Sequence, residues 1–168
     1  TEFAPKPDKV SREAHRQASA CAFFEPFNPF GDNVMAASIL DGKALAERIT
    51  DELRPRAEAL TKAGRKPGLA VILVGDDPAS QIYVRNKIRA CEKVGIESLE
   101  YRMPKETTQA ELLAQIEALN NDDKVDGILV QLPLPDQLSS DEVIAAISPA
   151  KDVDGFHVAS AGALMTGR

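Results

Sequence analysis

A run of six apolar residues from Leu69 to Val74 constrains the fold more than any other feature of the sequence. The run is rich in β-branched residues and has no polar position, so it predicts a strand whose two faces are both covered, as in a parallel sheet. It is much shorter than the roughly 20 apolar residues that cross a bilayer. We therefore expect a core strand in a globular domain, and no part of the chain is expected to cross a membrane.

Helical patterns flank this strand on both sides. Apolar residues recur at helical spacing between Asp41 and Gly64, although Pro55 lies inside that pattern and is expected to kink or divide the helix. A second helix is expected from about Ala79 to Val94, because Gly95 is a typical helix stop.

The later part of the chain continues the alternation of strands and helices. Apolar and polar residues alternate from Ser98 to Met103, which indicates an edge strand. The other elements expected are a helix capped by Thr108 and Glu111, a strand from Val125 to Gln131, and a helix from the cap formed by Ser139 and Glu142 through Ile147. This order predicts an α/β fold: an open, mostly parallel sheet in a three-layer α/β/α arrangement, with helices on both faces.

Charge and cysteine content restrict the partners and the compartment. The chain has a net charge of −6 and a pI near 5.0, whereas nucleic-acid binding relies on clustered Lys and Arg, so no nucleic acid partner is expected. The two cysteines, Cys21 and Cys91, form neither a disulfide framework nor a metal-binding spacing. We therefore expect no metal site and a cytoplasmic location.

Residues 1 to 34 differ from the rest of the chain. They hold five of the six Phe residues and show no sustained periodicity. We interpret residues 1 to 34 as a tail or an extension, and residues 35 to 168 as one domain. The alternative is an ordered extension that packs Phe23, Phe24, Phe27 and Phe30 on the domain.

Lys87 breaks the amphipathic pattern of the helix that follows the central strand. On a helical wheel it falls in the apolar arc with Val84, Ile88, Cys91 and Val94. One interpretation is structural: the butylammonium chain reaches water from the edge of that arc. The other is functional: the side chain projects into a cleft, with a pKa lowered from about 10.4 towards neutrality, and exchanges protons there.

Three further residues are candidates for the same site. Tyr83 precedes Lys87 by one turn, and Gln131 ends a strand at the carboxyl edge of the sheet, where open α/β folds bind ligands. A neutral amide such as Gln131 holds an amine without adding a charge. Asp154, with Asp152 nearby, is either a turn residue or a carboxylate that accepts hydrogen bonds from a nitrogen-rich heterocycle. Taken singly, Tyr83 and Gln131 are each explained by structure alone.

A different hypothesis starts from Asp76 and Asp77, which follow the central strand. Paired acids at this place can bind Mg²⁺, as in a phosphoacceptor regulatory domain. Such a domain also needs a lysine at the end of a late strand, and this sequence has none there.

Four motifs follow one another along the chain: Val74-Gly-Asp-Asp-Pro-Ala-Ser80, Tyr83-Val-x-x-Lys87, Gly127-Ile-Leu-Val-Gln-Leu-Pro-Leu-Pro135 and Pro149-x-Lys-Asp-Val-Asp-Gly-Phe156. In order and spacing they resemble the bifunctional methylenetetrahydrofolate dehydrogenase/methenyltetrahydrofolate cyclohydrolases. The resemblance covers about residues 38 to 168. It implies that residues 35 to 168 form a folate-binding catalytic domain.

The resemblance also implies a role for each candidate residue. Lys87 is then the catalytic lysine, which moves protons while methenyl-tetrahydrofolate is hydrolysed to formyl-tetrahydrofolate. Tyr83 stacks on the folate, Gln131 orients the lysine, and Asp154 holds the pterin ring. For the complete protein the resemblance implies a homodimer and NADP-dependent oxidation of methylene-tetrahydrofolate to methenyl-tetrahydrofolate.

The chain departs from the family at its end. In these enzymes a second, dinucleotide-binding domain carries a glycine-rich turn for the phosphates of NADP. No G-x-G-x-x-G pattern occurs before Arg168, so we expect the cofactor-binding residues to lie outside this chain and the catalytic domain to be truncated at its C-terminal end. The alternative is a folate-binding module without activity.

Overall fold

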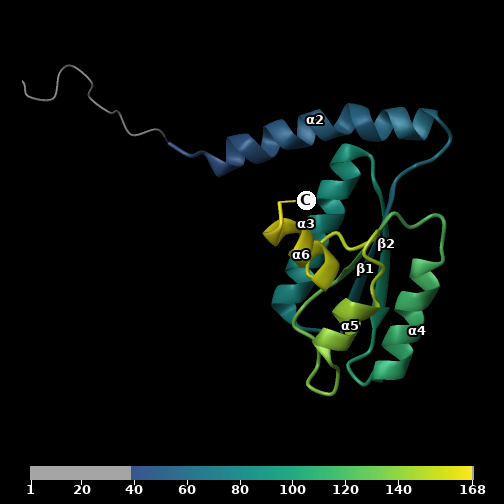
Figure 1. Ribbon diagram of the computed structural model, residues 1–168. Coiled ribbons are helices and arrows are strands. Elements are labelled where there is room, and N and C mark those ends of the chain that lie inside the picture. Colours follow the sequence, from purple (N-terminus) through teal and green to yellow (C-terminus); the bar gives the residue numbers. More distant parts are fainter. Residues whose placement is uncertain (1–38, 168) are drawn as a thin grey trace, which may run out of the picture. The chain divides into compact units, whose positions relative to one another are not determined.

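The computed structural model describes residues 39 to 167, and from Asp41 onward they form one compact unit (Figure 1). The interpretation of residues 1 to 34, with its alternative of packed Phe side chains, lies outside the described residues. The helices are α2 Gly42–Lys62, α3 Pro78–Val94, α4 Gln109–Asn120, α5 Ser140–Ala146 and α6 Val158–Met165, and the strands are β1 Gly68–Val74, β2 Glu97–Met103 and β3 Gly127–Val130. No helix within residues 39 to 167 is long and apolar enough to span a bilayer.

The predicted order of helices and strands is confirmed as far as α5. The last helix, α6, is not predicted by the sequence pattern, because Val158–Met165 consists almost wholly of small or apolar residues and has no polar face to produce a helical period.

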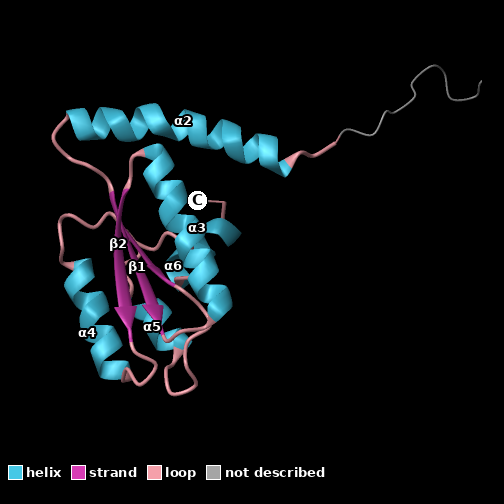
Figure 2. Ribbon diagram, turned by 180° about the vertical axis from the view of Figure 1, so that it is seen from behind, coloured by secondary structure: helices cyan, strands magenta, loops and turns pink. Residues whose placement is uncertain are grey.

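The three strands form one parallel sheet in the order β2-β1-β3 (Figure 2). β1 is central, and its side chains from Ala70 to Leu73 are at most 1% exposed. A polar side chain there would leave water without gaining a hydrogen-bond partner, which explains the unbroken apolar sequence. β2 is an edge strand, as predicted, and it alternates exposed Glu and Arg residues with half-buried apolar ones.

Helices cover both faces of the sheet, so the predicted three-layer arrangement is confirmed. On one face, Val71 and Leu73 pack with Val84 of α3. On the other, Ile72 packs in a larger core with Ile116 of α4 and Val143 of α5. Figure 2 shows α3 and α4 on opposite sides of the strands. The period of two along β1 therefore sends alternate side chains into two separate cores.

Two element boundaries differ from expectation. Pro55 does not divide α2, which runs through it as one helix. Nearly all of α2 is exposed, so water can satisfy the backbone carbonyl that Pro55 leaves without a donor. β3 is shorter than the expected strand: the N–H of Val125 donates to the carbonyl of Asp122 in a turn, whereas the N–H of Gln131 still donates to the carbonyl of Ile72 on β1 just after β3 ends.

β3 lies so close to a later loop that Gly127 has no room for a side chain. A Cβ atom there would overlap Cγ1 of Val153 and come within 3.3 Å of Cδ1 of Leu69. One residue further on, the N–H of Ile128 donates to the carbonyl of Lys151 at 2.8 Å. The loop that contains Val153 is therefore attached to β3 through direct contact with its backbone.

Gly127→Ala should lower the free energy of unfolding by about 1–3 kcal/mol, the usual cost of overpacking, as measured by urea denaturation. Adding Val153→Ala should restore most of this loss, because it removes the atom that the new methyl group would overlap. Gly42→Ala is the control and should cost nothing, since a Cβ there meets no atom within 4 Å. Equal losses at residues 42 and 127, or no restoration in the double variant, would contradict the close packing.

Candidate functional site

Lys87 lies at the edge of the buried face of α3. On that face Val84, Cys91 and Val94 are buried, while Lys87 and Ile88 are half-buried. The predicted apolar arc is therefore present, and the lysine is the charged residue within it. Because α3 begins immediately after β1, the helix places Lys87 beside the sheet.

The amine of Lys87 contacts the side chain of Gln131. Lys87 Nζ donates a hydrogen bond to Gln131 Oε1 at 3.0 Å, and both side chains are partly buried. Gln131 Nε2 in turn donates to the carbonyl of Leu132 at 2.6 Å. That second bond sets the orientation of the amide, because only the NH₂ group can donate to a carbonyl, and it turns Oε1 towards the lysine. The pairing expected between Lys87 and Gln131 is thus present in the structure.

Asp154 is exposed as a residue, but its carboxyl group is partly shielded from water. This burial raises the pKa of Asp154 above its ordinary value of 3.8. The positive charge of Lys87 opposes the shift, and the negative charge of Asp152 adds to it. Lys87 and Asp154 are therefore close enough to act on each other electrostatically, although they come from distant parts of the sequence.

Asp152 has a structural role in the turn that precedes Asp154. Burial alone would raise its pKa, but hydrogen bonds from the side chain of Ser160 and from the backbone outweigh this effect and lower the pKa. Among these, the N–H groups of Gly155 and His157 donate to its carboxylate at 3.1 and 3.0 Å. Of the two acids in the motif, Asp152 is the one whose carboxylate is held by the turn, and the carboxyl group of Asp154 interacts electrostatically with Lys87.

Tyr83 lies on α3 one turn before Lys87, and 60% of its surface is exposed. No hydrogen bond joins its hydroxyl group to another described residue. The structure therefore places Tyr83 on the same helix as Lys87 but does not bring it into a polar contact with Gln131 or Asp154. An exposed aromatic ring offers an apolar face for stacking.

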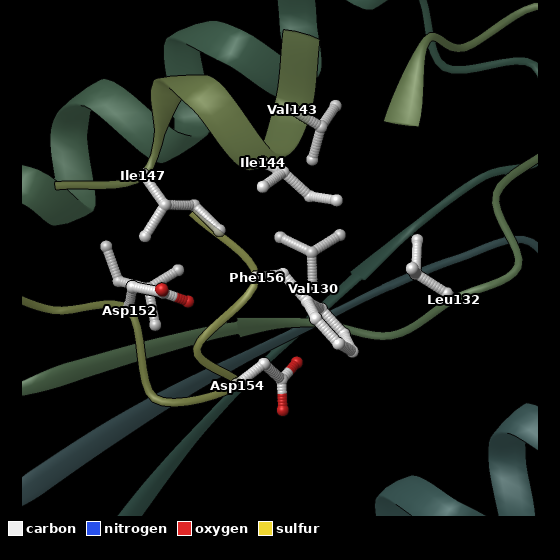
Figure 3. A pocket seen from close by; sticks show the side chains of 9 residues that line it. Val130, Leu132, Val143, Ile144, Ile147, Asp152, Asp154 and Phe156 are labelled. Carbon is white, nitrogen blue, oxygen red and sulfur yellow. The ribbon is translucent and has the colours of Figure 1, made fainter. Parts of the chain in front are cut away.

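A narrow apolar pocket adjoins the two acids. Figure 3 shows it, with side chains of α5 on one side and Asp152, Asp154 and Phe156 on the other. It is lined by Ile128, Val130, Leu132, Val143, Ile144, Ile147, Asp152, Asp154 and Phe156. The sequence reasoning misses this apolar lining, because buried residues of β3 and α5 look like ordinary core. The one signal in the sequence is Phe156, a large apolar residue two positions after Asp154; in the structure it is 57% exposed.

Asp77 has a structural role at the place where the alternative hypothesis expects a magnesium site. Asp77 is the N-cap of α3, and its carboxylate accepts the N–H of Ser80 at 2.7 Å. Hydrogen bonds from Ser80 lower the pKa of Asp77. Within residues 39 to 167, no group of three or more His, Cys, Asp or Glu side chains is arranged to hold a metal ion. The position of Asp77 after a strand is explained by helix capping.

The fold and the site together define an α/β domain that holds a lysine against a neutral amide at the carboxyl edge of a parallel sheet. Residues 40 to 154 match the family model described as "Tetrahydrofolate dehydrogenase/cyclohydrolase, catalytic domain". The chain belongs to this family, which confirms the resemblance of its four motifs and favours it over the phosphoacceptor hypothesis.

Relatives and solved structures agree with this assignment. The bifunctional protein FolD of Cupriavidus pinatubonensis is 61% identical over 133 residues, covering 79% of this chain and 47% of that protein. The bifunctional FolD methylenetetrahydrofolate dehydrogenase/cyclohydrolase from Campylobacter jejuni superposes with a TM-score of 0.77 at 52% identity, covering 79% of this chain and 47% of that one. The FolD structure from Trypanosoma brucei, complexed with NADP cofactor and inhibitor, has a TM-score of 0.72 at 34% identity, covering 76% and 44%. The chain thus spans about half the length of the curated relatives it matches.

Asp154→Asn should change the pH dependence of stability. A raised pKa in the folded state means that folding favours the protonated carboxyl group, so the wild type loses this contribution as the pH rises through that pKa. An asparagine does not ionise. As the pH rises from below the ordinary aspartate pKa to neutral, the stability of the variant relative to wild type should therefore increase. Urea unfolding at several pH values measures this change.

Asp152→Asn is the matched comparison and should show the opposite sign. Its folded-state pKa is lowered, so its contribution is present above the ordinary aspartate pKa and is lost as the pH falls through the folded value. This variant should be less stable than wild type at neutral pH and approach it in acid. The same sign at both positions would show that the two carboxyl groups do not differ in environment.

Proposed function

We propose that this chain is the folate-handling part of a methylenetetrahydrofolate dehydrogenase/cyclohydrolase and that its site hydrolyses methenyl-tetrahydrofolate to formyl-tetrahydrofolate. The observation that carries the proposal is the hydrogen bond of Lys87 Nζ to Gln131 Oε1 at 3.0 Å. It holds an amine at the carboxyl edge of a parallel sheet, where ligands of such folds bind. Family membership of residues 40 to 154 supports the same substrate class.

The chemistry of this hydrolysis needs a group that both accepts and donates a proton. Water adds to the methenyl carbon and loses a proton. One carbon–nitrogen bond then breaks as the departing nitrogen gains a proton, the hydroxyl group loses its own proton as the formyl C=O forms, and one proton is released overall. A neutral amine can accept the first proton and, as an ammonium, donate it to the departing nitrogen, while the hydroxyl proton leaves to solvent; Lys87 is therefore sufficient for the two transfers within the site. Gln131 keeps the amine in place by accepting a hydrogen bond from it, and as a neutral amide it adds no charge to the site.

Tyr83 and Asp154 are proposed to bind the substrate. The exposed ring of Tyr83 is available to stack on a flat aromatic part of the folate. The carboxyl group of Asp154 can form hydrogen bonds with the nitrogen-rich edge of a pterin, and its raised pKa reflects a partly desolvated position where such bonds are stronger. Tyr83 lies one turn before Lys87 on α3, and Asp154 is close enough to Lys87 for the two groups to interact electrostatically.

For the complete protein we propose NADP-dependent oxidation of methylene-tetrahydrofolate, a homodimer and a cytoplasmic location. The described residues do not fit the cofactor itself. The turn between β1 and α3, where a dinucleotide would need backbone N–H groups free for its phosphates, carries the carboxylates of Asp76 and Asp77, and Asp77 already accepts the N–H of Ser80. We therefore assign the cofactor to the half of the relatives' length that this chain does not span. A reducing compartment suits Cys91, which is a free buried thiol.

Lys87→Met should abolish cyclohydrolase turnover, a loss of at least roughly a hundredfold, while leaving folate binding intact. The reason is that methionine keeps the apolar stem and removes the proton-transferring amine. The measurement is a hydrolysis assay beside calorimetry with a folate analogue, both in the 168-residue chain and in the complete protein.

Lys93→Met on the exposed face of the same helix is the control and should retain turnover. Wild-type activity in Lys87→Met would refute the proposed role. Binding without turnover in the wild-type chain would assign it to folate binding alone.

A further inference from the structure

Asp154 depends on its loop for its position. No hydrogen bond or ion pair joins its carboxyl group to another residue between 39 and 167, so the loop backbone is what orients it. We call residues 151 to 157 the Asp154 loop. Three of its residues make bonds that fix it: Lys151 before Asp154, Asp152 within the turn, and His157 after it.

Lys151 joins this loop to the C-terminal end of α4. Its Nζ atom donates to the carbonyls of Leu119 and Asp122, each at 2.9 Å, and the contacts are partly buried. The last carbonyls of a helix lack partners within the helix and form the negative end of its dipole, so an ammonium group is stabilised there. The bond therefore places a positive charge where α4 attracts it.

The backbone of Lys151 makes two further links. Its carbonyl accepts the N–H of Ile128 on β3, and its N–H donates to the carbonyl of Ser148, each at 2.8 Å. Asn120, also at the end of α4, binds the preceding segment: it donates to the carbonyl of Ala146 at 2.8 Å and accepts the N–H of Ser148 at 2.9 Å. Lys151 is thus the point where α4, β3 and the Asp154 loop are joined.

We propose that Lys151 is a positioning residue for Asp154 and so determines how firmly the site holds the pterin ring. This inference rests on the proposed function. The Lys151 side chain donates to the carbonyl of Leu119 in α4 and to that of Asp122 just after it, and it does not line the pocket shown in Figure 3, so it acts through the loop and not on the substrate. Without its ammonium group, one side of the Asp154 loop is no longer anchored to α4, while Asp152 still holds the other.

The test is a double-mutant cycle on binding of folinic acid, a stable formyl-tetrahydrofolate, to the 168-residue chain. Lys151→Met should weaken binding roughly tenfold, since a small misplacement of a binding group has effects of this size. Asp154→Ala should weaken it at least as much. The double variant should bind no worse than Asp154→Ala alone, because Lys151 has nothing to position once the carboxyl group is gone. Additive losses would overturn the proposal.

Two further variants separate positioning from loss of folding. Lys151→Arg keeps the charge and the donors and should restore most of the affinity. Lys62→Met makes the same chemical change on an exposed lysine of α2 and should leave binding unchanged. If Lys151→Met does not fold, a comparison of Lys151→Arg with Lys151→Gln gives the same test, with weaker binding expected for the glutamine.

A measurement without ligand keeps the inference separate from the proposed function. The pKa of Asp154 can be measured by recording the NMR signal of its carboxyl carbon as the pH is changed. In Lys151→Met this pKa should move towards the ordinary aspartate value, because the loop loosens. If the wild-type chain fails to bind folinic acid, the proposed function fails while this titration still decides the position of Asp154. If wild type binds and Asp154→Ala weakens binding but neither the affinity nor the titration changes in Lys151→Met, the inference fails alone.

Discussion

The burial of β1 on both faces is the constraint on which the rest of the structure depends. Its side chains enter two cores, one beneath α3 and one beneath α4 and α5, which suits a central strand, and both of its neighbours are parallel to it. Parallel strands need crossover connections, here helices, and right-handed crossovers place α3 and α4 on opposite faces because the chain moves from β1 out to β2 and then back past β1 to β3. All strands then end at the same edge. That edge is where α3 presents Lys87 and where Gln131 follows β3.

Each segment that forms the site carries a polar or charged group at a place that is partly shielded from water. A lysine replaces an apolar residue on the buried face of α3, an amide follows the last buried residue of β3, and a carboxyl group with a raised pKa lies in the loop between α5 and α6. Each of these groups costs stability, because polar groups lose water there. The Lys87–Gln131 hydrogen bond and the electrostatic attraction between Lys87 and Asp154 offset part of this cost by satisfying the groups with one another.

Much of this could be predicted from residues alone, since the signals are local. The buried strand, the capping box at Thr108 and the helix stop at Gly95 each need only neighbouring residues, and all three are confirmed. Pro55 was expected to kink or divide the helix, and division was wrong: α2 is continuous, and its exposure lets water satisfy the carbonyl that Pro55 leaves without a donor. The apolar pocket beside Asp154 was missed because residues such as Val130 and Ile144 line a site only through their position in space.

The sequence by itself determined the layers of the fold, the family, and the identities of Lys87, Tyr83, Gln131 and Asp154 as candidates. It could do so because hydrophobic periodicity and motif spacing are properties of the chain. Only the tertiary structure decided which candidates meet. It brought the amine of Lys87 into a hydrogen bond with Gln131. It gave Asp152 a lowered pKa and Asp154 a raised one, and it joined their loop to α4 through a hydrogen bond from Lys151. These are contacts between residues far apart in sequence, and their geometry follows from how the layers pack.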